Sequence, residues 1–499
     1  MLSLTAEQVD RLRDRLRQIG FTYDAVADRL GSTAHAALGR NETTPGLRAT
    51  TDGSPISTLT RLWLLQAPVL SDDADRALPG LVDPLCIAGV LDRSDELVRA
   101  RVDLRPYAEG DGRDWWLVSD LTPGLDGGDA RIGPDHVLGV SSASTSLAQL
   151  TVREPVERAL DLGTGCGVQS MHLSRHAREV VATDVNERAL AMARLNAALN
   201  QVDLDVRRGS LYEPVRAGEQ FDLVVTNPPF VISPGTGERL VYRDSGLPGD
   251  EMMRRVVTGG APLLAPRGRL QVLGNWMHCD GEPWEERVGS WLRGTGCDAW
   301  VVQREVLDVA EYVELWLKDA GLHGAADYQN RYDTWLAWFE QQRVAGIGFG
   351  WLNLRRTDRD APGLRLEEWP FEVAQPLGPE VAGRERRTDW LARTSDAELL
   401  AARLVRPDHV RQETYGQPGA ADPEQVVLRQ QAGMRRARQV DTALGGLVGA
   451  CDGELMLGQI VDALVTLLGA AAQDGQAVRL EEVRELVADG FLEVPAISG

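Results

Sequence analysis

The chain has 499 residues, of which 43% are hydrophobic and 25% charged, and its formal net charge is −21. This length exceeds one ordinary hydrophobic core, so we expect two to four domains. The composition is that of a globular protein, and no apolar run reaches the ~18 residues of a membrane span. The charged residues 1–20 predict an amphipathic helix and not a signal peptide, so a cytoplasmic location is expected.

The negative charge argues against a broad nucleic-acid-coating surface, which would be basic, but it leaves room for a local basic groove. Five cysteines are scattered along the sequence, and none belongs to a CxxC pair. A disulfide framework and a structural zinc site are therefore both unexpected. No metal site is predicted.

Residues 1–104 are predicted to form an N-terminal helical module. Thr5 and Gln8 fit a capping box at the start of the first helix. Alternating strand patterns follow at residues 96–108 and 115–121. Short helices followed by a strand pair indicate a winged-helix-like module, and a helical cap on the next domain is the alternative.

Residues 105–375 alternate strand and helix patterns, which predicts a doubly wound, Rossmann-like α/β domain. Helices are expected between the strands, for example over residues 186–200 and 250–264. A long helical segment separates the last two strands, so an antiparallel edge strand is expected at the end of the domain. The seven expected strands are 158–162, 179–183, 203–207, 221–226, 268–273, 299–305 and 346–354.

Polar, proline-bearing residues 376–430 are predicted to form a linker with helices. Residues 431–499 read as helices ending in a short apolar strand, which indicates a second winged-helix-like module. Arginines in this part could contact phosphate or could form a solvated helix face; they are Arg429, Arg435, Arg436 and Arg438.

Residues 139–151 place small hydroxyl side chains just ahead of a helix. Two interpretations are open. Such a segment can lie over a bound ligand, or Ser144 or Thr145 can simply be the N-cap of the helix.

Residues 161–167 (DLGTGCG) predict a glycine turn from a strand into a helix, a signature of nucleotide binding. The spacing is G-x-G-x-G and not G-x-G-x-x-G, and a carboxylate precedes the turn. That carboxylate would face an ammonium group better than a pyrophosphate, which disfavours NAD and favours S-adenosylmethionine. The candidate cofactor-binding residues of the turn are Asp161, Gly163, Thr164, Gly165 and Gly167.

Two more strand ends extend this predicted cofactor site. Asp184 ends the second expected strand, where a carboxylate can accept hydrogen bonds from both hydroxyls of a ribose. Helix capping is the alternative role for Asp184, and Val185 follows it. Ser210 and Leu211 come after the third strand, where an adenine amino group and ring would be held.

The fourth expected strand ends in Asn227, Pro228, Pro229 and Phe230. The prolines fix the backbone and remove N–H donors, so carbonyl oxygens are available beside the amide of Asn227. Such a turn can hold a planar –NH₂ group while Phe230 stacks on its face. Hydrogen bonds to the amino hydrogens favour a more tetrahedral nitrogen, whose lone pair can attack a methyl group. An ordinary strand-end turn is the alternative.

Taken together, DLGTGCG, ATDVN, GSLYEP and FDLVVTNPPF resemble the successive motifs of class I S-adenosylmethionine-dependent N-methyltransferases of the NPP(F/Y) type. The resemblance covers residues 139–275 well and 105–375 in outline. It implies a seven-stranded methyltransferase core, S-adenosylmethionine as cofactor, and direct displacement without a metal. It also implies that Asn227 holds the substrate amine and contacts the cofactor, that Phe230 stacks on the substrate, and that Pro228 and Pro229 shape the turn.

These motifs most resemble those of the release-factor glutamine methyltransferases and the ribosomal-RNA guanine or adenine N-methyltransferases. It departs from the former because Phe230 replaces a usual tyrosine and Ser210 a common aspartate, which puts a glutamine substrate in doubt. The expected acceptor is a planar nitrogen of a base in ribosomal or other structured RNA. A glutamine of a translation factor, a small molecule, and a non-catalytic binding scaffold are the alternatives.

Residues 231–251 form a glycine- and proline-rich segment after the NPPF motif. We expect this segment to gate or read the substrate, and a merely solvated loop is the alternative. Its candidate substrate residues are Tyr242, Arg243 and Asp244.

Overall fold

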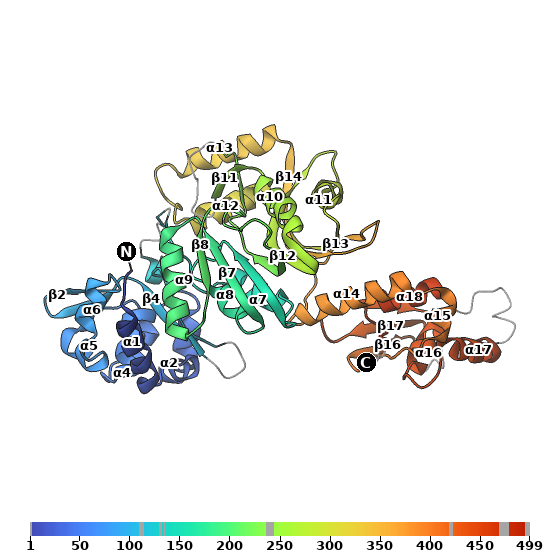
Figure 1. Ribbon diagram of the computed structural model, residues 1–499, viewed down its shortest axis with the longest axis horizontal. Coiled ribbons are helices and arrows are strands. Elements are labelled where there is room, and N and C mark those ends of the chain that lie inside the picture. Colours follow the sequence, from blue (N-terminus) through green and yellow to red (C-terminus); the bar gives the residue numbers. More distant parts are fainter. Residues whose placement is uncertain are drawn as a thin grey trace. The chain divides into compact units, whose positions relative to one another are not determined.

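The computed structural model describes residues 2–108, 114–128, 132–133, 135–235, 244–418, 423–468 and 479–494. The chain divides into two compact units: residues 1–148 with 154–370, and residues 149–153 with 371–499. The first unit holds the large central sheet, and the second holds a small sheet with helices (Figure 1). Within the described ranges, no helix is long and apolar enough to cross a bilayer.

The chain begins with an amphipathic helix that is capped as predicted. In α1 (Ala6–Ile19), Thr5 accepts a hydrogen bond from the backbone of Gln8 and the side chain of Gln8 accepts one from the backbone of Thr5. This reciprocal pair satisfies two N–H groups that the first helical turn leaves without partners. Helices α2 (Tyr23–Leu38) and α3 (Thr44–Ala49) follow.

Three short strands with helices before and between them come next. The strands form an antiparallel sheet in the order β1-β3-β2, and the winged-helix-like reading of this module stays a prediction. The elements are α4 (Pro55–Leu59) with a π turn, β1 (Val69–Leu70), α5 (Ser71–Ala77), α6 (Val82–Ile87), β2 (Leu91–Ser94) and β3 (Leu97–Ala100).

The predicted strand pair of this module was only partly right. Strand β2 pairs with β3 in an antiparallel hairpin, whereas β4 (Asp103–Ala108) and β5 (Asp114–Ser119) form a separate antiparallel pair. Strand β2 has the sequence LDRS, which is too short and polar to show a strand period. Asp95, with a positive φ of 53°, lies in the tight turn between β2 and β3, just before the predicted strand region.

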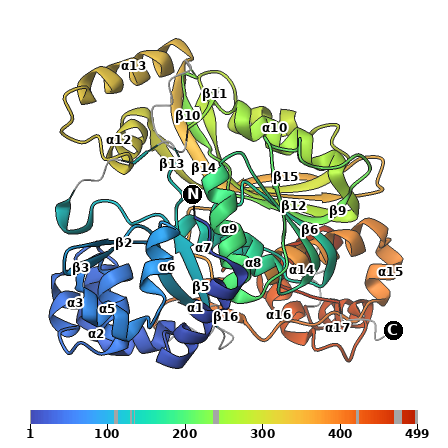
Figure 2. The same ribbon diagram turned by 60° about the vertical axis from the view of Figure 1, so that its left-hand side comes forward.

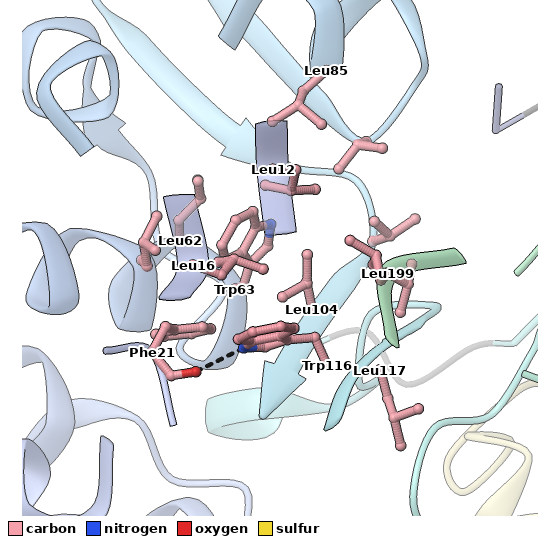
Figure 3. Packing of buried hydrophobic residues seen from close by; sticks show 14 of the residues in the cluster. Leu12, Leu16, Phe21, Leu62, Trp63, Leu85, Leu104, Trp116, Leu117 and Leu199 are labelled. Carbon is pink, nitrogen blue, oxygen red and sulfur yellow. Dashed lines mark hydrogen bonds between the residues drawn. The ribbon is translucent and has the colours of Figure 1, made fainter. Parts of the chain in front are cut away.

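One hydrophobic core joins the N-terminal module to the first strands and helices of the central domain, across the predicted boundary at residue 104. Figure 3 shows Trp63, Leu104 and Trp116 packed together, with Leu199 of α9 (Glu187–Asn200) on the same core. The indole N–H of Trp116 donates to the carbonyl of Phe21 at 2.7 Å, so its polar atom is satisfied inside the core. Truncation of such a buried tryptophan typically costs about 3–5 kcal/mol.

The central sheet has eight strands in the order β15-β13-β14-β12-β9-β6-β7-β8. All seven predicted strands are present, which confirms the doubly wound α/β class, and β15 is an additional parallel strand at the edge. The bounds are β6 (Val156–Leu162), β7 (Ala177–Asp184), β8 (Asp205–Arg208), β9 (Phe221–Thr226), β12 (Leu264–Cys279), β13 (Cys297–Asp308), β14 (Val344–Arg356) and β15 (Leu364–Glu368).

The prediction of an antiparallel edge strand was wrong in its position. Strand β14 is antiparallel to both of its neighbours, but it lies between β12 and β13 inside the sheet. It is buried along almost its whole length, as a strand with partners on both sides and cover on both faces should be.

Helices connect the strands of the central sheet. Helix α10 packs against β12, and α12 and α13 lie side by side (Figure 2). Two short strands, β10 (Val231–Ser233) and β11 (Asp244–Pro248), pair in parallel directly after the NPPF motif. The helices are α7 (Ser142–Leu150), α8 (Val168–Leu173), α9, α10 (Glu251–Gly260), α11 (Trp284–Leu292), α12 (Val309–Asp319) and α13 (Tyr328–Gln341).

The second unit combines a three-stranded antiparallel meander with helices around its own hydrophobic core. The predicted linker with helices over residues 376–430 was incomplete, because β16 and β17 lie there in addition to α14 and α15. Its elements are α14 (Gly378–Arg393), α15 (Asp396–Ala401), β16 (Val410–Tyr415), β17 (Gln425–Gln430), β18 (Ala437–Val440), α16 (Thr442–Ala450), α17 (Leu457–Leu468) and α18 (Leu480–Ala488).

Candidate active site

A cavity of about 340 Å³ lies where β6, β7 and β9 end. Ligands of open α/β sheets bind at this edge, beyond the carboxyl ends of the strands. The cavity brings together nearly all of the predicted site residues: Asp161, Gly163, Thr164, Gly165, Asp184, Val185, Ser210, Leu211, Asn227, Pro228, Pro229, Phe230 and Asp244. The candidates Tyr242 and Arg243 lie outside the described residues.

The glycine turn after β6 leaves open space at two positions. Gly163 and Gly165 have positive φ values of 73° and 55°, and an added Cβ at either would meet no protein atom within 4 Å. Their backbone is therefore exposed to whatever occupies the cavity, as a ligand cradle requires. The backbone N–H groups of Gly163 and Thr164 both donate hydrogen bonds to the carbonyl of Thr183, at 2.9 and 2.8 Å, and these bonds hold the turn in place.

Gly167 has a different role from the one predicted. It does not line the cavity but is the N-cap of α8, with φ +90°. A Cβ added there would lie 3.4 Å from the backbone of Ala193 on α9. Gly167 thus permits the close approach of α8 and α9 behind the turn and is not part of the cavity wall.

Asp161 is a buried carboxylate at the cavity floor. One of its oxygens, Oδ2, accepts hydrogen bonds from the Thr164 hydroxyl at 2.6 Å and from the backbone and hydroxyl of Ser170 at 2.8 and 2.7 Å. Burial raises the pKa of Asp161 to about 6, although these hydrogen bonds oppose the rise. Because the three donors all meet Oδ2, Oδ1 is the oxygen that can receive a ligand's ammonium group.

Asp184 at the end of β7 accepts hydrogen bonds from two loops, the glycine turn after β6 and the segment that leads into α9. Its Oδ2 accepts from the backbone N–H of Gly165 at 3.0 Å, and its Oδ1 accepts from that of Asn186 at 2.8 Å. Asn186 is the N-cap of α9, and its side-chain oxygen accepts a hydrogen bond from the N–H of Arg188 at 2.9 Å. Burial raises the pKa of Asp184.

Ser210 and Leu211 lie on the cavity wall beyond β8. Ser210 is solvent-exposed, and its backbone N–H donates to Glu213 at 3.1 Å. Leu211 has a positive φ of 46°, a conformation that is uncommon for a non-glycine residue. With this backbone conformation, the apolar side chain of Leu211 lines the cavity.

The NPPF turn begins at Thr226, whose hydroxyl donates to the carbonyl of Leu162 at 2.7 Å and so fixes β9 beside β6. The amide oxygen Oδ1 of Asn227 is buried and has no hydrogen-bond partner among the described residues. An unpaired buried acceptor costs free energy. It therefore marks a position where a ligand N–H would be stabilised.

A clamp of aromatic residues from α12 and α13 holds the strand that follows the NPPF turn. The Tyr312 hydroxyl accepts from the N–H of Ile232 at 2.7 Å, and Trp335 donates from its indole N–H to the carbonyl of Ile232 at 3.0 Å. Asn275 on β12 also donates to Tyr312, at 3.1 Å. Phe230 meets Trp316 edge to face, with ring centroids 6.0 Å apart.

The clamp was not predicted. The sequence of 309–341 shows aromatic residues at helical spacing, which is typical of packing, and nothing in it indicates which strand they contact. Ile232 lies 80 residues before Tyr312 in the sequence. A pairing at such a distance has no local signature.

The segment before α7 also lines the cavity, through His136, Gly139, Ser141 and Ser144. The N-cap interaction comes from Ser141, whose hydroxyl accepts from the N–H of Ser144 at 3.3 Å, and not from Ser144 or Thr145 as predicted. The segment thus both borders the cavity and caps α7 through Ser141, and its place over a bound ligand stays a prediction.

Asp120 anchors this segment and was not identified from the sequence. It accepts from the N–H of Val137 at 2.8 Å and pairs with Arg188 of α9, with a Nε–Oδ1 distance of 2.9 Å. The ion pair connects the segment to the helix that starts just after Asp184.

The arginines proposed as phosphate contacts in the second unit are engaged in ion pairs. Arg429 pairs with Glu413, Arg435 with Glu372, and Arg438 with Glu485. Arg436 is buried and lies 4.0 Å from Asp489. Within the part of the chain that the structure describes, no group of three or more His, Cys, Asp or Glu side chains could hold a metal.

The cavity residues fit S-adenosylmethionine. Asp161 offers a buried carboxylate for an ammonium group, Asp184 offers one for ribose hydroxyls, and the open glycine turn leaves room for the ligand against the backbone. The unpaired oxygen of Asn227 lies in the same cavity. It can therefore accept from an N–H group on a second ligand.

Comparison with protein families matches residues 139–277 to the methyltransferase small domain. Residues 18–101 and 385–494 match two domains of unknown function, DUF7059 and DUF7782.

Among curated proteins, the chain is 31% identical over 204 residues to the release factor glutamine methyltransferase of Deinococcus radiodurans, which covers 36% of this chain and 72% of the relative. It is 37% identical over 76 residues to that of Flavobacterium psychrophilum, covering 15% of this chain and 27% of the relative. It is 40% identical over 104 residues to the ribosomal protein L11 methyltransferase of Symbiobacterium thermophilum, covering 19% and 33%.

Among solved structures, a putative methyltransferase from Bacillus halodurans is 14% identical with a TM-score of 0.28, covering 44% of this chain and 100% of that chain. A 16S rRNA methyltransferase of T. thermophilus, solved in complex with AdoMet and guanosine, is 14% identical with a TM-score of 0.27, covering 63% of this chain and 72% of that chain.

The cavity and the relatives agree on the cofactor and on the class of enzyme. The chain is an S-adenosylmethionine-dependent methyltransferase. It belongs to the class I methyltransferases with a methyltransferase small domain, the family that includes the release factor glutamine methyltransferases.

Proposed function

We propose that this enzyme methylates a planar –NH₂ nitrogen of a base in structured RNA. The observation that carries the proposal is the buried, unpaired Oδ1 of Asn227 at the cavity. An amide oxygen is an acceptor only, so it calls for an N–H donor on the substrate. A planar amino group beside the aromatic ring of Phe230 satisfies this requirement.

The chain's own residues divide into two sets. Asp161, Asp184 and the glycine turn hold S-adenosylmethionine, which supplies an activated methyl group on its sulfonium. Asn227, with the carbonyl of Pro228, accepts hydrogen bonds from the amino group and orients its lone pair. Phe230 provides the face on which the base stacks, and Trp316 supports that ring from its edge. Positioning of this kind supplies most of the rate enhancement for a direct displacement.

Two features support an RNA base as acceptor. Unstacked bases of single-stranded or looped RNA are recognised by stacking on aromatic side chains and by hydrogen bonds to their edges, which is what Phe230 and Asn227 offer. A winged-helix-like N-terminal module, as predicted for residues 1–104, would supply a second surface for a large, structured substrate.

A glutamine side chain of a translation factor is the second candidate. Its amide is also a planar –NH₂ group, and relatives from Deinococcus radiodurans and Flavobacterium psychrophilum are named release factor glutamine methyltransferases. The net charge of −21 also suits a protein partner better than a polyanion.

Methyl transfer from radiolabelled S-adenosylmethionine to the macromolecules of a cell extract tests the proposal. The extract should come from cells that lack the enzyme, so that acceptor sites are unmodified. Label that is released by nuclease and resists protease supports the RNA candidate. Label that is released only by protease contradicts it and supports the glutamine candidate.

A further inference from the structure

A glutamine side chain of α8 lines the cavity at the end where Asp161 lies. Gln169 is 7% exposed, and it lines the same cavity as Asp161. The next residue along α8, Ser170, donates from its backbone N–H and its hydroxyl to Oδ2 of Asp161, at 2.8 and 2.7 Å. Consecutive residues of one helix thus hold Asp161 and present Gln169 at the same end of the cavity.

The orientation of the Gln169 amide is fixed by one hydrogen bond. Its Nε2 donates to the backbone carbonyl of Ser144 in α7 at 2.7 Å. A carbonyl can only accept, so the nitrogen of the amide must be the atom that faces Ser144. The other amide atom, Oε1, has no hydrogen-bond partner among the residues that the structure describes. This largely buried oxygen is therefore an acceptor for an N–H group of a ligand.

Two acceptor oxygens at one end of the cavity call for a ligand group with several N–H donors. Oδ1 of Asp161 is the first of them and Oε1 of Gln169 is the second. The ammonium group of S-adenosylmethionine has three N–H donors, so one carboxylate oxygen alone leaves donors over. A neutral amide is the suitable second acceptor, because another carboxylate would repel Asp161, whose pKa burial already raises to about 6.

We propose that Gln169 is a specificity-determining residue for the cofactor, whose Oε1 accepts one N–H of the ammonium group while Oδ1 of Asp161 accepts another. Nε2 of the same side chain holds Ser144, so the ammonium group is linked to the first turn of α7. A ligand without the ammonium is rejected, because it leaves the buried oxygen unpaired. The inference concerns the donor of the methyl group, so it holds whether the methylated molecule is RNA or protein.

The first test compares two ligands by calorimetry on the full-length enzyme. S-adenosylhomocysteine has the same amino-acid end as the cofactor, and its deaminated analogue has a hydrogen in place of the ammonium. Gln169→Met keeps the length of the side chain, and we expect it to lower the preference for S-adenosylhomocysteine over the analogue about tenfold or more, as for loss of a hydrogen bond to a charged group. An unchanged preference would overturn the inference.

Two controls accompany this measurement. The Kd of Gln169→Met for the deaminated analogue should equal that of the wild type, which shows that the rest of the cofactor site is folded. Gln329→Met changes an exposed glutamine of α13 in the same way and should keep the wild-type preference.

Gln169→Glu separates the two ends of the side chain. It keeps an oxygen for the ammonium and loses the N–H that Ser144 accepts. At a pH where the introduced carboxyl is ionised, we expect a preference for S-adenosylhomocysteine at least as strong as that of the wild type. Loss of the preference to the same extent as in Gln169→Met would overturn the inference, because the effect would then come from the bond to Ser144 and not from Oε1.

Discussion

The phenol oxygen of Tyr312 accepts a hydrogen bond from the backbone N–H of Ile232 at 2.7 Å, two residues after Phe230. Tyr312 belongs to α12, in the segment between β13 and β14, whereas Ile232 continues the NPPF turn. The same phenol oxygen accepts from Asn275 on β12. This oxygen thus fixes the acceptor turn to both a strand of the sheet and a helix that covers it.

Tyr312→Phe removes that oxygen and leaves two buried donors unpaired. Each lost bond to a buried donor costs about 1–3 kcal/mol, so we expect a lower melting temperature and a kcat reduced about tenfold or more. The Kd for S-adenosylmethionine should change little, because Asp161 and Asp184 are untouched. Tyr332→Phe is the control, since Tyr332 on α13 bonds the exposed Glu314 and not the turn. Equal effects of the two variants would contradict a positioning role for Tyr312.

Asp184→Ala should act on the cofactor. The carboxylate bonds the backbone of Gly165 at 3.0 Å and is placed to receive ribose hydroxyls. Hydrogen bonds to charged groups contribute about 1.5–3 kcal/mol, so a roughly 10- to 100-fold increase in the Kd for S-adenosylmethionine is expected by calorimetry. Asp203→Ala, an exposed aspartate ahead of β8, should leave the Kd unchanged. A normal Kd in Asp184→Ala would exclude the ribose role.

The raised pKa of Asp161 predicts two opposite pH effects. Burial moves this pKa from 3.8 to about 6, so the neutral carboxyl is favoured in the folded protein. Its contribution to stability without ligand is therefore fully present below about pH 4 and is lost as the pH rises through about 6. Affinity for a ligand ammonium changes in the other direction, because only the ionised carboxylate can pair with it.

Calorimetric titration of S-adenosylmethionine between about pH 5 and 7.5 measures the second effect. We expect the Kd to rise by up to about tenfold for each pH unit below 6. Asp161→Asn should bind more weakly at every pH and should lose this slope. An unchanged slope in Asp161→Asn would assign the titration to another group.

Binding of the substrate should depend on salt if the substrate is RNA. Each phosphate contact releases counterions, so affinity falls steeply between about 50 and 200 mM salt for a protein that makes several such contacts. Fluorescence titration with total RNA would show the slope. A flat response would favour the glutamine candidate, in keeping with the ion-paired arginines of the second unit.

Which strand ends meet at the cavity could be predicted from the sequence, because each of them has a local signature. Gly163 and Gly165 are needed for the turn itself, and Asp184 ends an apolar run. Their meeting in one cavity follows from the parallel order of β6, β7 and β9. The position of the NPPF turn at the cavity could be predicted in the same way. Two prolines and an amide directly after a strand rarely occur together for structural reasons alone.

The residues that support the site were not predictable, because their partners are remote in sequence. Asn196 on α9 shows why. Its amide donates to the carbonyl of Cys166 at 2.7 Å and bonds both backbone groups of Val118, so it connects the glycine turn to β5. In the sequence it is one polar residue within an apolar helix pattern. Asp120 and Tyr312 were missed for the same reason.

The most direct test of the account is the effect of Asn227→Ala on transfer and on cofactor binding in the same preparation. Removing the amide oxygen that accepts a hydrogen bond from the acceptor nitrogen should lower the rate of methyl transfer about 100-fold or more, comparable to loss of one preorganised hydrogen bond in other active sites. The Kd for S-adenosylmethionine should remain within a few-fold of the wild-type value. Methyl transfer at the wild-type rate, or loss of cofactor binding with the fold intact, would contradict the assignment of Asn227 as the residue that holds the acceptor nitrogen.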